Sequence, residues 1–113
     1  MSAITTHVLD TARGAPAAGV PVELELRDGA GWRALGKGAT DQDGRLRTLL
    51  SPGAALIAGV YRISFDTGAY FKAQAQPGFF PEVRIVFQIA EAGGHYHVPL
   101  LLSPFGYSTY RGS

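Results

Sequence analysis

The stretch Val20-Pro21-Val22-Glu23-Leu24-Glu25-Leu26-Arg27 places a valine or leucine at every second position and charged residues between them after Pro21. Because successive side chains of a strand point to opposite faces, this alternation indicates a strand that is buried on one face only. The residues that follow, Asp28-Gly29-Ala30-Gly31, tolerate the backbone angles of a tight turn. We therefore expect Trp32 to Lys37 to return as the hairpin partner of the first strand.

Short apolar runs separated by glycine, proline and aspartate continue along the rest of the chain, and they predict six further strands. These are Ile4 to Leu9, Arg45 to Leu50, Val60 to Phe65, Val83 to Ile89, His95 to Leu102 and Tyr107 to Tyr110. Asp66-Thr67 can cap one short helix that runs through Gln74 and is ended by Pro77-Gly78. About eight short strands and one helix indicate an all-β fold, a two-sheet antiparallel β-sandwich.

Composition limits the classes of partner and cofactor. The 113 residues are expected to form a single domain over residues 1–113. Ten basic and nine acidic residues give a net charge of +1, which does not favour nucleic acid or an anionic membrane. No cysteine is present, so disulfides and sulfur-bound metals are excluded. The longest apolar stretches are about half of the roughly 20 residues that a spanning helix needs, and no leader precedes His7, so we expect a cytoplasmic protein.

The three histidines are the candidates for proton transfer, because imidazole accepts and releases protons near neutrality. Strand alternation places His7 on the side opposite Ile4 and Val8, facing away from the core, and it places His95 and His97 on one side of their strand. Taken singly, each is more often an ordinary surface residue. His95-x-His97 with His7 could also hold a metal, but no nearby acidic pair completes such a site, so no metal is expected.

Arg45 follows the turn Asp41-Gln42-Asp43-Gly44, where its guanidinium either is solvated or binds a planar, oxygen-rich anion through its forked donors. The last residues, Tyr107 to Ser113, are rich in polar donors. Pro99 interrupts the last long apolar run and predicts a sheet edge or a bulge there. No Gly-x-Ser-x-Gly elbow and no phosphate-binding glycine loop is present in the sequence.

Five motifs of this chain resemble those of the transthyretin-like family, and within it those of the branch that hydrolyses 5-hydroxyisourate in urate degradation. The resemblance runs from end to end, and the motif Tyr110 to Ser113 is the most specific, because it separates the hydrolases of the family from its hormone carriers. The motifs are Thr6-His7-Val8-Leu9-Asp10, Thr40-Asp41-Gln42-Asp43-Gly44-Arg45, Phe79-Phe80-Pro81-Glu82-Val83, the stretch from His95 to Pro104, and Tyr110-Arg111-Gly112-Ser113.

The resemblance implies a homotetramer, a dimer of dimers, with active sites in clefts where the two dimers face each other. It implies catalytic roles for His7, Arg45, His97 and Ser113. It also implies that the substrate is bound by His7, Arg45, Tyr110, Arg111, Gly112 and Ser113. His95 matches no role in the family's site.

The reaction that the resemblance implies is hydrolysis of 5-hydroxyisourate to 2-oxo-4-hydroxy-4-carboxy-5-ureidoimidazoline. It requires no cofactor, and we expect a histidine to activate the water as general base. The alternative is a transthyretin-like carrier that binds a small ligand without reacting it. The histidines and the last four residues speak against a carrier, whose channel should be lined mainly by apolar groups.

Overall fold

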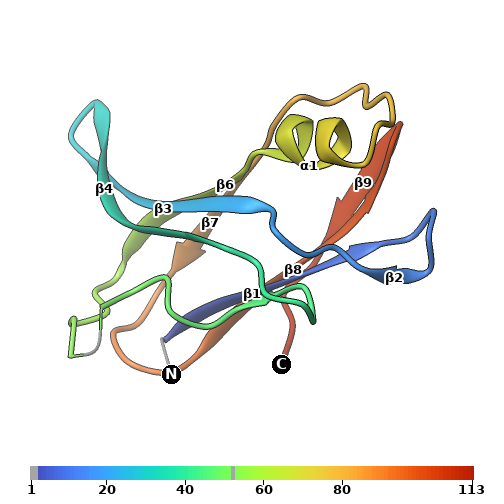
Figure 1. The fold of residues 1–113 in the computed structure, drawn as a ribbon. Coiled ribbons are helices and arrows are strands. Elements are labelled where there is room, and N and C mark those ends of the chain that lie inside the picture. Colours follow the sequence, from blue (N-terminus) through green and yellow to red (C-terminus); the bar gives the residue numbers. More distant parts are fainter. Residues whose placement is uncertain (1–2, 52) are drawn as a thin grey trace.

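Two β-sheets face each other and enclose one hydrophobic core in the computed structural model, which describes residues 3–51 and 53–113 (Figure 1). Met1, Ser2 and Pro52 lie outside the described residues. The first sheet contains β1 (Ile4–Asp10), β2 (Ala15–Pro16), β5 (Arg45–Leu46), β8 (Tyr96–Ser103) and β9 (Gly106–Thr109). The second contains β3 (Pro21–Asp28), β4 (Gly31–Ala39), β6 (Gly59–Phe65) and β7 (Val83–Ile89). The two-sheet sandwich expected from the sequence is confirmed.

The hairpin expected from the opening stretch is present as β3 and β4, which pair antiparallel from Asp28 opposite Gly31. The alternation also holds, because Val22, Leu24 and Leu26 are buried while the charged residues between them are at least partly exposed. Buried side chains of β3 and β6 meet those of β1 and β8 across the sandwich. This apolar layer is what holds the two sheets together.

One strand pair differs from the antiparallel arrangement that we expected. β1 and β8 run parallel, from Ile4 opposite Tyr96 to Asp10 opposite Leu102. The buried hydroxyl of Thr6 adds a hydrogen bond of 2.6 Å to the carbonyl oxygen of Val98 across this pair. Two strands more than 90 positions apart can pair in either direction, and nothing in their local pattern distinguishes the two.

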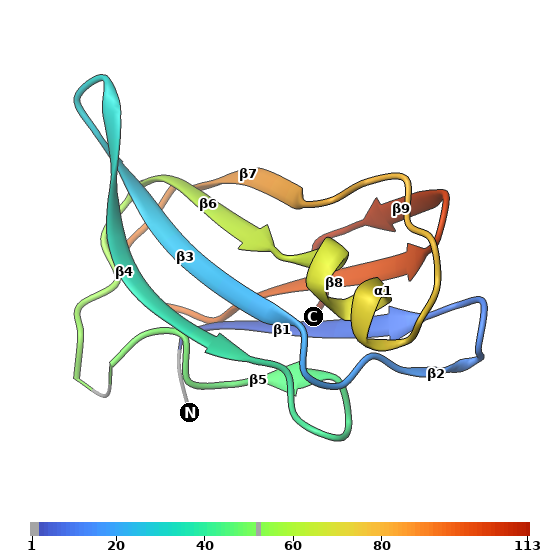
Figure 2. The same ribbon diagram turned by 45° about the horizontal axis from the view of Figure 1, so that its top comes forward.

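The helix α1 (Thr67–Ala73) lies at the end of the sandwich where β1 and β8 finish (Figure 2). Asp66 caps it as expected, because its carboxylate accepts a hydrogen bond from the N–H of Ala69 at 3.0 Å. The helix ends at Ala73 with Gln74 as its C-cap, within one residue of the expected end and before Pro77 and Gly78. Ala75 adopts a positive φ of 54°, and the N–H of Gln76 bonds back to the carbonyl of Phe71 at 2.9 Å, which closes the last turn. The expectation that Pro77-Gly78 ends the helix was therefore wrong.

The strand expected over Arg45 to Leu50 is only two residues long, β5. The chain leaves the sheet after Leu46 because Leu49 and Leu50 turn into the core, where they are 1% and 7% exposed. His95 precedes β8 instead of beginning it. Within the described residues, no helix is long and apolar enough to cross a membrane.

Pro99 lies in β8 between β1 and β9, so the expected sheet edge is absent there. Pairing with β9 stops at Leu100 opposite Thr109 and resumes, in the same register, as a single bridge between His97 and Gly112. Because proline has no N–H to donate, the ladder is interrupted beside Pro99. The last residues of the chain leave the regular sheet at this interruption.

Candidate active site

A tight turn fixes the position of Arg45. The carboxylate of Asp41 accepts hydrogen bonds of 2.9 Å from the N–H groups of Asp43 and Arg45. The hydrogen bond from the Arg45 N–H is the main cause that lowers the pKa of Asp41. Gly44 has a φ of +75°, and a Cβ there would lie 2.3 Å from the carbonyl oxygen of Val8. Only glycine meets both demands, so the turn lies directly on β1 and sets Arg45 opposite His7.

His7 projects from β1 beside this turn. Its Nε2 lies 2.9 Å from the carbonyl oxygen of Asp43. A carbonyl oxygen only accepts hydrogen bonds, so Nε2 of His7 carries a proton. In the neutral ring, Nδ1 is then the nitrogen that can accept a proton.

His97 lies across the parallel pair from Thr5, and its Nδ1 is 2.8 Å from the Thr5 hydroxyl oxygen. It borders a small hollow of about 130 Å³. Polar and cationic side chains surround that hollow. The lining residues are Thr5, Thr6, Arg45, Arg47, His95, His97 and Ser113.

Both of these histidines favour the neutral state. Partial burial, followed by the positive charge of Arg45, lowers the pKa of His7 below the usual 6.5. The pKa of His97 is lowered by the same two causes in the same order, and then by the neighbouring His7 and His95. A neutral imidazole can accept a proton at pH 7, so this arrangement suits general-base chemistry.

The last residues of the chain fold back onto His97. The N–H of Gly112 donates to the carbonyl oxygen of His97 at 2.9 Å, and the guanidinium carbon of Arg111 lies 4.8 Å from the centroid of the Tyr96 ring. A Cβ on Gly112 would lie 2.6 Å from Cδ2 of His97. Glycine is therefore required here for space, and it lets Ser113 reach the hollow.

Sequence analysis and structure agree on part of this cluster. Arg45, His97 and Ser113 meet at one hollow, whereas His7 lies beside Arg45 without bordering it. Tyr110 and Arg111 border a second, more apolar hollow of about 340 Å³, in which His97 takes part together with residues of β7.

Four residues of the hollow's wall had no site role in the sequence analysis: Thr5, Thr6, Arg47 and His95. Thr5 could have been noticed, because it shares a strand face with His7. His95 and His97 were expected on one side of their strand, and their rings do lie nearly parallel, with centroids 6.5 Å apart.

The site shows no metal-binding geometry. Among the described residues, no group of three histidine, aspartate or glutamate side chains converges. The spacing His95-x-His97 directs both rings to the Thr5 hydroxyl instead, at 3.2 Å from His95 Nε2 and 2.8 Å from His97 Nδ1.

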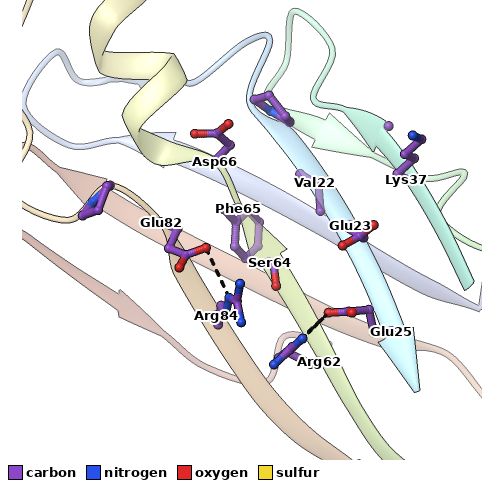
Figure 3. Close-up of a pocket in the computed structure, with 13 residues that line it drawn as sticks. Val22, Glu23, Glu25, Lys37, Arg62, Ser64, Phe65, Asp66, Glu82 and Arg84 are labelled. Atoms are coloured by element: carbon purple, nitrogen blue, oxygen red, sulfur yellow. Dashed lines mark hydrogen bonds and ion pairs between the residues drawn. The ribbon is translucent and has the colours of Figure 1, made fainter. Parts of the chain in front are cut away.

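A larger hollow, about 840 Å³, lies elsewhere, on the outer face of the second sheet (Figure 3). Its two arginines are already paired with glutamates, Arg62 with Glu25 at 2.7 Å and Arg84 with Glu82 at 3.2 Å. By contrast, no carboxylate of the described residues forms an ion pair with Arg45, so its guanidinium is available to a ligand. We therefore place the candidate site on the first sheet.

Comparison with known proteins gives a family match over nearly the whole chain. Residues 4–112 match the model of the HIUase/Transthyretin family. The chain belongs to this family. Relatives named hydrolase and relatives named transthyretin share the fold, so membership does not by itself decide the activity, and the side chains of the site must.

Three relatives illustrate that range. A 5-hydroxyisourate hydrolase of Salmonella dublin is 50% identical over 110 residues, which are 97% of this chain and 80% of the relative. The structure of Klebsiella pneumoniae 5-hydroxyisourate hydrolase superposes with a TM-score of 0.85 at 40% identity, covering 100% of this chain and 94% of the other. Transthyretin from Sparus aurata superposes with a TM-score of 0.90 at 34% identity, covering 99% and 97%.

The close approach of Gly112 to His97 can be tested with Gly112→Ala. The added methyl group must displace either the His97 ring or the chain end, so the ring resonances of His97 should shift in NMR spectra. Overpacking of this kind costs about 1 to 3 kcal/mol where neighbours cannot move. Gly106→Ala is the matched control, because its Cβ would lie 3.7 Å from the nearest atom outside its chain neighbours. Unshifted His97 resonances in Gly112→Ala would contradict this packing.

Proposed function

We propose that this protein hydrolyses 5-hydroxyisourate to 2-oxo-4-hydroxy-4-carboxy-5-ureidoimidazoline, a step of urate degradation. One observation carries the proposal. A hollow of about 130 Å³ brings Arg45, His97 and Ser113 together, with His7 directly beside Arg45. The substrate class is that of the hydrolases to which the chain is 50% and 40% identical.

In the proposed reaction, water attacks a ring carbonyl carbon, the adjacent ring C–N bond breaks, and the released nitrogen takes a proton. His7 or His97 accepts the proton of the attacking water. The lowered pKa values of both residues support this role, because each ring is neutral at pH 7. The reaction consumes only water and needs no cofactor.

Arg45 binds the oxygen-rich edge of the substrate and stabilises the negative charge that develops on the attacked carbonyl. A planar guanidinium presents paired donors to two oxygens at once, which a point charge cannot do. The Asp41 turn fixes the backbone of Arg45 beside the hollow that its side chain borders, which supports this role.

The last four residues complete the proposed site. Ser113 borders the hollow and orients water or substrate, together with Arg45 and His97. Tyr110, Arg111 and Gly112 bind substrate in this proposal, and Gly112 also holds the chain end on His97.

A homotetramer, a dimer of dimers, is also part of the proposal, together with a cytoplasmic location. β7 and β9 lie at the edges of their sheets, where unpaired backbone groups can meet those of another copy. Large apolar side chains are exposed near these edges, among them Phe79 and Phe105 at 70% and Val86 at 53%.

The ring-opening activity is tested with freshly generated 5-hydroxyisourate, whose ultraviolet absorbance is followed against the spontaneous rate. The protein should accelerate the decay. His7→Ala and His97→Ala should each lower kcat by about 10²- to 10⁴-fold if the altered ring is the base, and Arg45→Ala by about 10²- to 10³-fold. Comparing the two histidine variants identifies the base.

Arg84→Ala is the control for these variants, because it removes a guanidinium from the outer face of the second sheet, and its kcat should equal that of the unchanged protein. Decay no faster than in buffer, from a folded protein, would reject hydrolysis. The transthyretin-like carrier would then be the better interpretation, and binding of small ligands would be measured next.

The acid limb of the pH–rate profile follows from the lowered histidine pKa values. Because the base must be neutral, kcat/KM should be constant near pH 7 and fall on acidification, with a midpoint below 6.5. Arg45→Gln removes a positive charge that disfavours the imidazolium, so the midpoint of its residual activity should move upward. Arg45→Lys keeps the charge and should leave the midpoint in place. An equal midpoint in Arg45→Gln and in the unchanged protein would contradict the effect of the Arg45 charge on the histidine pKa.

The proposed assembly is tested by sedimentation velocity over a dilution series, with specific activity measured at each concentration. A tetramer with sites between dimers should lose activity per chain as it dissociates, since mass action governs the population. Full specific activity in a confirmed monomer would exclude sites shared between copies.

A further inference from the structure

His95 and Thr5 form a chain of side chains behind His97 that the proposed reaction does not use. The Thr5 hydroxyl oxygen lies 2.8 Å from His97 Nδ1 and 3.2 Å from His95 Nε2. Thr5 is only 4% exposed, whereas His95 is exposed. Pairing of β1 with β8 sets Thr5 directly opposite His97. A buried hydroxyl therefore links a site histidine to one at the surface.

Proton counting limits how these three groups can bond. A hydroxyl donates one hydrogen bond, so Thr5 cannot donate to both rings at once. If Thr5 donates to His97, then Nδ1 of His97 is the acceptor and its Nε2 carries the proton. If Thr5 donates to His95, then Nδ1 of His97 is the donor, and Nε2 of His97 is left free to accept a proton.

The arrangement in which His97 donates to Thr5 and Thr5 donates to His95 also suits the protonated state of His97. When His97 takes a proton on Nε2, its Nδ1–H continues to donate to Thr5, and Thr5 continues to donate to His95. No hydrogen bond in the chain needs to reverse, so the site is already organised for the charge that develops. A base oriented by a further group is the usual arrangement in hydrolytic sites.

We propose that Thr5 and His95 are positioning residues, which hold His97 in the tautomer with its proton on Nδ1 and its Nε2 free to act as the base. The role of Nε2 as a base rests on the proposed hydrolytic function, with His97 and not His7 as its base. The tautomer itself does not, because it is set before any substrate binds, by the three side chains together with the backbone carbonyl of Thr5, which also faces His97.

Other charged groups face His97 and must stay unchanged during the test. These are Arg45 on β5, Arg47 just after it, His7 on β1 and His95 before β8. Substitutions at Thr5 leave all four in place. A change in His97 can then be assigned to the lost hydroxyl.

The experiment reads the tautomer of His97 by NMR of ¹⁵N-labelled imidazole rings, without substrate, above the titration range of the ring. The unchanged protein should carry the proton on Nδ1. Thr5→Val keeps the branched shape but lacks the hydroxyl, so the proton should move at least partly to Nε2. Thr5→Ser keeps the hydroxyl and should keep the proton on Nδ1. His95→Gln retains an acceptor for Thr5 and should behave like Thr5→Ser, while His95→Leu should behave like Thr5→Val.

Kinetics of the same variants connect the tautomer to turnover. Thr5→Val should lower kcat roughly tenfold with little change in KM, the loss expected for one hydrogen bond to a group that becomes charged. Thr5→Ser should restore most of it. Thermal unfolding of each variant separates this loss from a loss of folded protein.

Two results would overturn the proposal: a His97 proton on Nε2 in the unchanged protein, or the same tautomer and kcat in Thr5→Val. Failure of the unchanged protein to open the ring would instead reject the proposed function. The tautomer measurement would still decide whether Thr5 and His95 set the proton of His97.

Discussion

The parallel pairing of β1 with β8 is the constraint on which the site depends. It runs over seven residue pairs, from Ile4 opposite Tyr96 to Asp10 opposite Leu102. A shift by one residue would exchange the two faces of β1, turning Ile4 and Val8 out of the core and Thr5 into it. The buried bond from Thr6 to the carbonyl of Val98, 2.6 Å long, opposes such a shift. One register thus serves both the packing of the sandwich and the contact between Thr5 and His97.

The position of Arg45 depends on a second constraint, the Asp41 turn. Hydrogen bonds to one carboxylate, together with a glycine where no Cβ fits, hold the turn on β1. The positive charge of Arg45 has two effects. It is available to an anionic ligand, and it also opposes protonation of His7 and His97. Binding of an anion and neutral imidazoles are therefore compatible at one place, which a cluster of histidines without Arg45 would not ensure.

The fold is shared by relatives that hydrolyse and by relatives named transthyretin, so backbone geometry alone does not decide the activity. Side chains at partly exposed positions of a sandwich can be exchanged without changing its core. His7, Arg45 and His97 are all partly exposed on the first sheet, while the core beneath them is aliphatic and aromatic. Function can thus change at these positions at little cost to folding.

The sequence by itself determined the two-sheet architecture, the β3–β4 hairpin and the cap at Asp66, because these follow from alternation, turn residues and bonds between near neighbours. The resemblance of its motifs also predicts His7, Arg45, His97 and Ser113 as site residues, and this stays a prediction. The end of α1 depends on backbone hydrogen bonds, which no single residue type predicts. Only the tertiary structure decided that β1 and β8 run parallel, that Leu49 and Leu50 leave β5 for the core, and that Thr5 lies between His95 and His97. These are contacts between segments far apart in the chain, and local propensity carries no information about which distant strand a residue will face.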